Sequence, residues 1–96
     1  MQKGGKGHGE AATPEAAFAK ALQEMRKERG MSQEALGFES GYHRTYISML
    51  ERGIHNPSLR TILSVSSALG VSATKIVQRV EEKLGKNWKR ESRSER

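Results

Sequence analysis

Polar and cationic side chains gather in one short stretch of the chain, between Gly41 and Gly53. Two arginines, a histidine, two tyrosines, a threonine and a serine stand there beside a single carboxylate, Glu51. Most of these groups donate hydrogen bonds and some carry positive charge, so they suit reversible recognition of an anionic partner with polar edges. The stretch therefore indicates a binding surface.

Catalysis and metal binding are not predicted. The chain has no cysteine and no aspartate, and its three histidines, His8, His43 and His55, are scattered without acidic or thiol neighbours at metal-ligand spacing. The glycines of the first ten residues lie in a polar segment and not between a strand and a helix, so they do not form a phosphate loop. We expect no enzyme activity, no cofactor and no metal ion.

The composition favours a small basic domain. Only 34% of the 96 residues are hydrophobic, which predicts a small core. The formal net charge of +6 suits a polyanionic partner. Cysteine is absent, and no apolar run approaches the ~20 residues of a membrane span. We therefore expect a cytoplasmic protein without membrane association.

Capping residues and glycines divide the chain into five predicted helices, an all-α fold. Apolar residues recur within these segments at three- and four-residue spacing. The predicted helices run from Pro14 to before Gly30, from Gln33 to about Glu39, from about His43 to Glu51, from Leu59 to Ala68, and from after Ser72 to about Gly85.

These helices set the predicted organisation of the chain. Residues 1–12 are expected to form a disordered tail, and residues 13–84 a single domain. Residues 85–96 are a charged extension, helical if the fifth helix continues past Gly85. The fourth helix is expected to turn four apolar side chains inward: Leu59, Ile62, Leu63 and Leu69.

The second and third predicted helices are short and separated by a few residues that include Gly41. Such spacing makes two helices cross steeply, the helix-turn-helix arrangement. Leu36, Ile47 and Leu50 can meet inside the crossing. The outer face of the third helix then keeps residues of the kind that touch base edges in such motifs: Tyr42, His43, Arg44, Thr45, Ser48 and Met49.

The stretch from about Leu22 to Ser72 resembles the helix-turn-helix domain shared by phage lambdoid repressors, Cro proteins and xenobiotic-response-element-type regulators. The resemblance rests on R-x-x-x-G-x-S-Q-E-x-L, the turn glycine, Y-I-S-x-x-E-x-G and N-P-S-L. Within that family, HRTYIS-x-x-ERG-x-x-N-P-S-L most resembles restriction–modification controller proteins. The resemblance implies a five-helix lambda-repressor-like fold. It also implies a dimeric transcriptional regulator of prokaryotic or phage origin that binds duplex DNA at the nucleoid.

The same resemblance assigns DNA contacts. Arg44 is the leading candidate for base reading, because a guanidinium can donate two hydrogen bonds to guanine; a phosphate contact alone is the alternative. Tyr46 is expected on the backbone, with a place in the core as its alternative. The base-contacting set is His43, Arg44, Thr45 and Met49. The phosphate-contacting set is Ser32, Gln33, Tyr46, Arg52 and Asn56.

Structural roles follow from the resemblance as well. It implies a partly buried salt bridge between Arg26 and Glu51. Gly37 and Ser40 stand where the family usually has alanine-like and apolar residues, so we expect looser packing of the second helix. A homodimer interface is expected on the last helix, with cover for the first helix as the alternative: Val77, Val80, Leu84 and Trp88.

Two other functional classes stay open. One is an antitoxin-type regulator that also binds a toxin through a tail or the last helix. The other is a protein-interaction module that resembles coactivators and binds little DNA. The polar outer face of the third helix argues against the second class.

Overall fold

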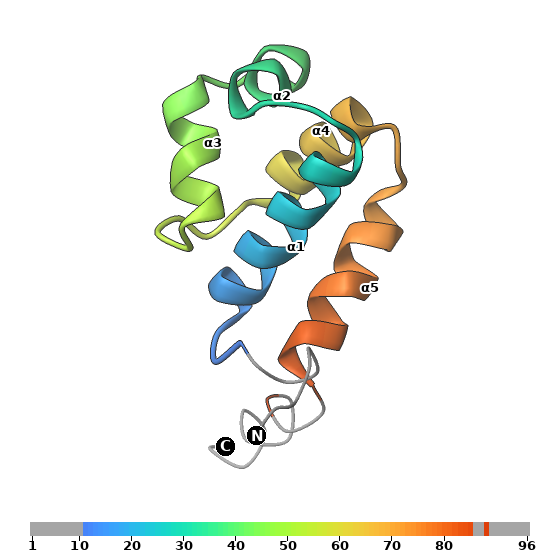
Figure 1. The fold of residues 1–96 in the computed structure, drawn as a ribbon. Coiled ribbons are helices and arrows are strands. Elements are labelled where there is room, and N and C mark those ends of the chain that lie inside the picture. The colour runs from blue at the N-terminus through green and yellow to red at the C-terminus, as the bar shows by residue number, and fades with distance from the viewer. Residues whose placement is uncertain (1–10, 86–87, 89–96) are drawn as a thin grey trace.

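The computed structural model describes residues 11–85 and Trp88, and in this part of the chain it contains five α-helices and no strand (Figure 1). The predicted all-α class is confirmed, and the helix bounds agree closely with the sequence prediction. The helices are α1 (Pro14–Glu28), α2 (Gln33–Ser40), α3 (Arg44–Glu51), α4 (Leu59–Leu69) and α5 (Ala73–Leu84).

Each helix begins at a side chain that accepts a hydrogen bond from the backbone of its own first turn. Serine or threonine fills this place in four helices, as is usual for N-caps. Gly41 ends α2 in the left-handed region, at φ 85°, where a side chain would be strained. The caps are Thr13, Ser32, His43, Ser58 and Ser72.

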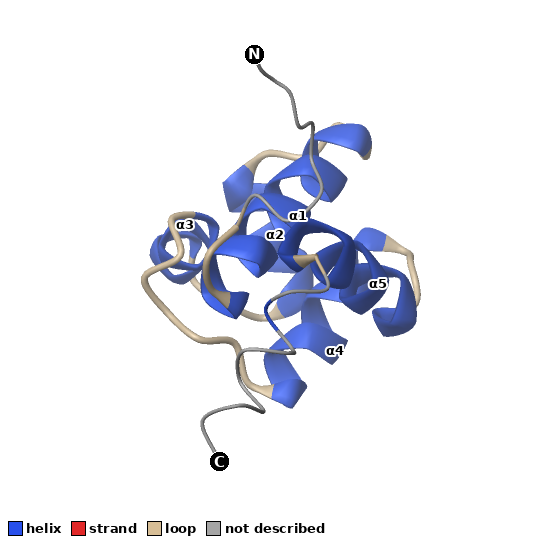
Figure 2. Cartoon of the chain, turned by 90° about the horizontal axis from the view of Figure 1, so that it is seen from below, coloured by secondary structure: helices blue, strands red, loops and turns tan. Residues whose placement is uncertain are grey.

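The core forms around α1, which packs against α3 and α5, while α2 packs against α3 and α4. Figure 2 shows α3 on one flank of the bundle and α5 on the other. Every helix contributes at least one buried apolar side chain, so burial fixes all five in one unit. The core cluster consists of Phe18, Leu22, Met25, Leu36, Ile47, Leu50, Val65, Leu69 and Ile76.

Two predicted core residues of α4 lie on the surface instead. Leu59 is 71% exposed and Leu63 is 52% exposed. The buried side of α4 is centred on Val65 and Leu69, and a helix turns by about 100° per residue. Positions 59 and 63 are therefore rotated well away from it. The inward prediction was wrong for these two leucines.

The described part of the chain differs from the predicted boundary at its N-terminal end and agrees with it at the end of α5. Ala11, expected in the tail, is buried, and its N–H donates to the Lys83 carbonyl at 3.2 Å. At the other end α5 stops at Leu84, and Gly85 has φ 78°. The remainder of the predicted tail (1–10) and most of the predicted extension lie outside the described residues.

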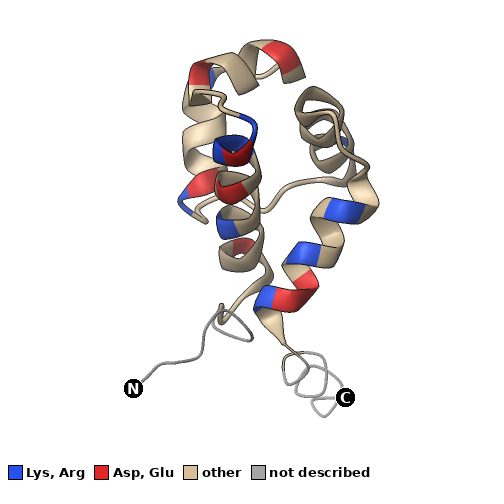
Figure 3. Cartoon of the chain, turned by 45° about the vertical axis from the view of Figure 1, so that its right-hand side comes forward, with Lys and Arg blue, Asp and Glu red and all other residues tan. Residues whose placement is uncertain are grey.

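Ion pairs join α5 to α1 on the surface. Figure 3 marks the positions of the basic and acidic residues along the helices. Arg79 donates to Glu28 at 2.8 Å and to Glu24 at 3.3 Å, and Lys83 donates to Glu24 at 2.7 Å. The hydrogen bond from Arg79 holds the pKa of Glu28 below its usual range. Any stability from this exposed pair is present above the usual carboxyl pKa and is lost as the pH falls through the lowered value.

None of the described helices is long and apolar enough to cross a membrane.

Candidate nucleic-acid interface

The two sides of α3 differ sharply in burial. Ile47, Leu50 and Glu51 are buried against the core. Arg44 and Arg52 are exposed. At about 100° per residue Arg52 falls opposite the buried residues, and Arg44 lies at the border of the exposed side, next to the position of Glu51. Ser48 and Met49, half-buried, and Thr45, exposed, complete this surface. We call it the α3 outer face: Arg44, Thr45, Ser48, Met49 and Arg52.

A buried ion pair fixes α3 against α1. The Arg26 Nε donates to Glu51 Oε2 at 2.6 Å and its Nη2 to Oε1 at 2.9 Å, while Nη1 donates to the Met31 carbonyl at 2.8 Å. The Glu51 side chain is 1% exposed. The hydrogen bonds that Arg26 donates to Glu51 raise the pKa of Arg26, so the guanidinium stays charged. The structure thus contains the salt bridge that the sequence predicted.

Gln33 belongs to the same cluster. Its Nε2 donates to Glu51 Oε1 at 3.0 Å, so the amide is already engaged within the protein. Ser32 is the exposed cap of α2, and its hydroxyl accepts from the Ala35 N–H. For a phosphate contact at this end, the first backbone N–H groups of α2 are therefore better placed than the Gln33 amide.

His43 stands at the N-cap of α3 and not inside the helix. Its Nδ1 accepts from the Thr45 N–H at 3.1 Å, an arrangement that leaves Nε2 as the hydrogen-bearing nitrogen in the neutral ring. The ring is exposed next to Arg44 and Thr45. The structure therefore brings three of the predicted base-contacting residues together at the start of α3.

Tyr46 occupies an intermediate position. It is half-buried, its hydroxyl lies 3.2 Å from the Thr61 hydroxyl, and its ring centre is 4.9 Å from that of Tyr42 and 5.6 Å from that of His55. Tyr46 is thus partly buried, as in the alternative that placed it in the core. It also lies at the edge of the α3 outer face.

The loop after α3 extends the basic surface. Arg52 forms the C-cap of α3, and Asn56 is exposed in the loop before α4. Between residues 40 and 80 the one carboxylate in the sequence is the buried Glu51. Of the cations in this range, Arg79 pairs with Glu24 and Glu28 of α1. The sequence alone could have shown this asymmetry, which the net charge conceals. The cations in the range are Arg44, Arg52, Arg60, Lys75 and Arg79.

The helix-turn-helix family model matches residues 22–76, more than half of the chain. The chain belongs to the helix-turn-helix family. This helix-turn-helix chain is 49% identical over 55 residues to the control protein C.BamHI of Bacillus amyloliquefaciens, covering 56% of this chain and 68% of that one. It is 40% identical over 58 residues to an HTH-type transcriptional regulator, y4dJ, of Sinorhizobium fredii, covering 60% of this chain and 75% of that one.

Solved structures agree with this family. The restriction–modification controller protein C.AhdI of Aeromonas hydrophila superimposes with a TM-score of 0.63 and 39% identity, over 65% of this chain and 94% of that one. A hypothetical transcription factor from Neisseria superimposes with a TM-score of 0.64 and 36% identity, over 67% of this chain and 74% of that one. The predicted resemblance to helix-turn-helix regulators and controller proteins is confirmed.

Gly37 tightens the helix-turn-helix where looser packing was expected. A Cβ added at Gly37 would lie 2.8 Å from the Tyr42 carbonyl oxygen and 3.2 Å from the Arg44 backbone nitrogen. Both are backbone atoms, so they cannot move aside as a flexible side chain would. The absence of a side chain lets α2 approach the start of α3 closely, and the expectation of loosening was wrong at this position.

Gly37→Ala is expected to lower the free energy of unfolding, because its methyl group must push α2 and the segment before α3 apart. Overpacking of this kind costs about 1–3 kcal/mol, which exceeds the gain from alanine's helix propensity, at most ~1 kcal/mol. Urea unfolding measures the difference. Phe38→Ala, at the neighbouring 83% exposed position, is the control and should change stability by less than about 0.5 kcal/mol. A Gly37→Ala protein as stable as the wild type would contradict the crowding.

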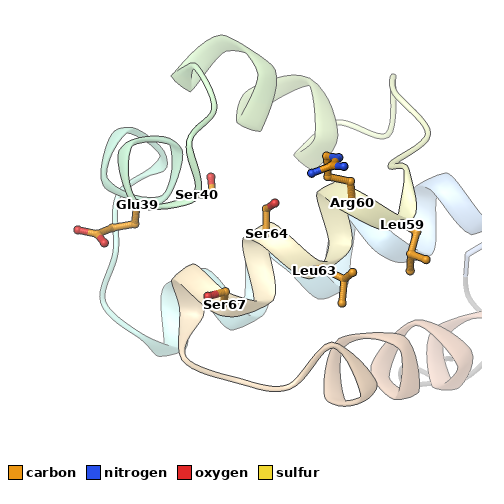
Figure 4. A pocket seen from close by; sticks show the side chains of 7 residues that line it. All are labelled: Glu39, Ser40, Leu59, Arg60, Leu63, Ser64 and Ser67. Atoms are coloured by element: carbon orange, nitrogen blue, oxygen red, sulfur yellow. The ribbon is translucent and has the colours of Figure 1, made fainter.

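A groove lies on the surface where the end of α2 meets α4, at Ser40, the second position that departs from the family pattern. The Ser40 hydroxyl donates to the Leu36 carbonyl at 2.7 Å, so it stays within its own helix and does not reach across. Figure 4 shows Ser64 on the side of α4 that faces Ser40, with Leu63 turned to the opposite side. The groove is lined by Glu39, Ser40, Leu59, Arg60, Leu63, Ser64 and Ser67.

The four predicted dimer residues have different environments. Val77 is 42% exposed and Trp88 is 36% exposed. Val80 is half-buried and packs against the core, which matches the alternative that it covers the domain. Leu84 is half-buried at the end of α5. Leu59 and Leu63 of α4 are further exposed apolar residues.

Proposed function

We propose that this chain is a sequence-specific, DNA-binding transcriptional regulator that reads the major groove with α3. The observation that carries the proposal is the α3 outer face. Exposed Arg44, Thr45 and Arg52 stand there beside the half-buried Ser48 and Met49, and a buried ion pair fixes the other side of the helix against α1. An α-helix fits the major groove, where base pairs present distinct patterns of donors and acceptors. The named relatives are regulators and control proteins, which supports a role without catalysis.

The proposed contacts divide into two classes. Arg44 donates to a guanine edge, and His43, Thr45 and Met49 complete the base-reading set. Backbone contacts fix the register: the start of α2 with Ser32 and Gln33 on one side, and Tyr46, Arg52 and Asn56 on the other. Because cations and helix N-termini supply much of the attraction, affinity should fall steeply as salt is raised.

The regulator is proposed to act as a homodimer in the cytoplasm, at the nucleoid. A two-fold axis would place two copies of α3 about one turn of DNA apart, ~34 Å, and give a nearly palindromic site. Exposed apolar side chains away from the α3 outer face support such an interface. The proposed interface combines Val77, Leu84 and Trp88 with Leu59 and Leu63, while Val80 backs it from the core side.

Val77→Asp is expected to shift the protein from dimer to monomer, because a carboxylate in an apolar interface loses its water without gaining a partner. Sedimentation equilibrium over a range of protein concentrations measures the change. Gln78→Asp is the matched control, since it adds the same charge at the next exposed position. Unchanged dimerisation in Val77→Asp would exclude Val77 from the interface.

Selection of bound sequences from a random DNA pool tests the proposed function directly. A regulator of this kind should enrich one sequence with two-fold symmetry, whose half-site spacing reports the dimer geometry. If no sequence is enriched while the protein stays folded, the proposal fails and the protein-interaction module is favoured.

A further inference from the structure

One buried hydroxyl joins the start of α3 to α4. Thr61 is 3% exposed, in the first turn of α4. Three other hydroxyls surround its Oγ1: Tyr42 and Tyr46 each at 3.2 Å and Ser58 at 3.1 Å. We call these four side chains the Thr61 hydroxyl cluster.

The hydrogen-bonding capacity of a threonine matches this arrangement. A hydroxyl donates one hydrogen bond and accepts two, so Thr61 can bond all three neighbours at once. Ser58 is held in turn, because its Oγ accepts from the Thr61 N–H at 3.0 Å as the cap of α4. Since Thr61 is buried, removing its hydroxyl would leave its neighbours short of a partner.

The cluster brackets the base-reading residues. Tyr42 comes just before α3 and Tyr46 lies in its first turn, so His43, Arg44 and Thr45 fall between the two anchored tyrosines. The tyrosine rings also lie against each other, with their centres 4.9 Å apart. A single side chain on α4 therefore restrains both ends of the segment that carries the proposed base contacts.

We propose that Thr61 is a positioning residue for DNA recognition: through Tyr42 and Tyr46 it fixes the orientation in which the start of α3 meets the bases. Thr61 itself is buried and does not touch DNA. This inference rests on the proposed function. The proposal means that discrimination between DNA sequences depends on the Thr61 hydroxyl of α4, which lies outside the helix-turn-helix pair of α2 and α3. General affinity for DNA depends on this hydroxyl less. Base readout tolerates only small errors in side-chain placement, whereas attraction to phosphates tolerates larger ones.

The test compares Thr61→Val, which replaces the hydroxyl by a methyl group of similar size, with Thr61→Ser, which keeps the hydroxyl. Affinities are measured for the selected DNA site and for random duplex DNA. Thr61→Val should lower the ratio of the two affinities about tenfold, by weakening binding to the selected site alone. Thr61→Ser should restore the ratio, and Thr74→Val, on the exposed side of α5, should not change it.

The outcomes separate the two proposals. If the wild-type protein selects no sequence, the proposed function fails. If it selects a site and a folded Thr61→Val protein keeps the wild-type ratio, the positioning role is wrong. If Thr61→Val does not fold, Tyr42→Phe decides, because it removes one bond of the cluster and leaves no buried phenol unpaired. A reduced ratio in folded Tyr42→Phe supports the role, and an unchanged ratio overturns it.

Discussion

Glu51→Gln is expected to lower the free energy of unfolding by about 3–5 kcal/mol, the cost of removing one partner from a buried ion pair. Glutamine has nearly the same shape, so the change is mainly one of charge. Arg26 would keep its charge beside a neutral amide, and the Gln33 amide would lose the carboxylate that accepts its bond. Urea unfolding followed by circular dichroism measures the loss.

Two further variants show whether the loss in Glu51→Gln comes from the burial of the ion pair. Glu28→Gln removes a carboxylate from the exposed pair with Arg79, so its effect should be far smaller. Arg26→Met combined with Glu51→Met replaces both charges by apolar groups and should be less damaging than Glu51→Gln alone. Equal losses from Glu28→Gln and Glu51→Gln would show that burial of the pair does not govern stability.

Arg44→Ala is expected to abolish specific retardation of the selected DNA while the circular-dichroism spectrum stays unchanged. Each guanidinium–guanine contact contributes about 1–3 kcal/mol of discrimination, and a dimer would lose two of them. Arg44 is exposed and makes no hydrogen bond or ion pair among the described residues, so the fold does not depend on its side chain. An electrophoretic shift assay with specific and random duplexes measures both kinds of binding.

Lys20→Ala is the matched control, because it removes an exposed cation from α1, away from the α3 outer face. It should weaken binding to both duplexes slightly and equally, as a general electrostatic effect does. Undiminished specific binding by Arg44→Ala would remove Arg44 from the base-reading set. An equal loss on both duplexes would reassign it to a phosphate.

Much of the fold could be predicted from local signals. Caps such as Ser32 and the stop at Gly41 mark helix ends in the sequence. The short connection between α2 and α3 predicts that they cross, with Leu36, Ile47 and Leu50 inside the crossing. The Arg26–Glu51 pair followed from the family pattern. These features depend on nearby residues or on motifs with fixed spacing, so they can be read without coordinates.

Features that depend on packing between distant residues were harder to predict. Leu59 and Leu63 look like core residues by type, and only the placement of α4 against its neighbours shows that they face outward. Gly37 looks like a weak helix residue until the Tyr42 carbonyl is found against it. The bond from Gln33 to Glu51 joins positions 18 residues apart, and no sequence period indicates it.

The placement of α1 has a consequence for the spacing of DNA half-sites. Through Arg26 it holds α3, and through Glu24 and Glu28 it holds α5. In the proposed dimer, α3 reads the bases and α5 lies at the two-fold axis, and both helices are therefore held by the same helix, α1. Each added base pair rotates one half-site by about 34–36° around the DNA axis. Because α1 fixes the orientation of α3 relative to α5, the dimer cannot adjust to that rotation. We therefore expect the regulator to tolerate altered bases within a half-site better than one extra base pair between the half-sites.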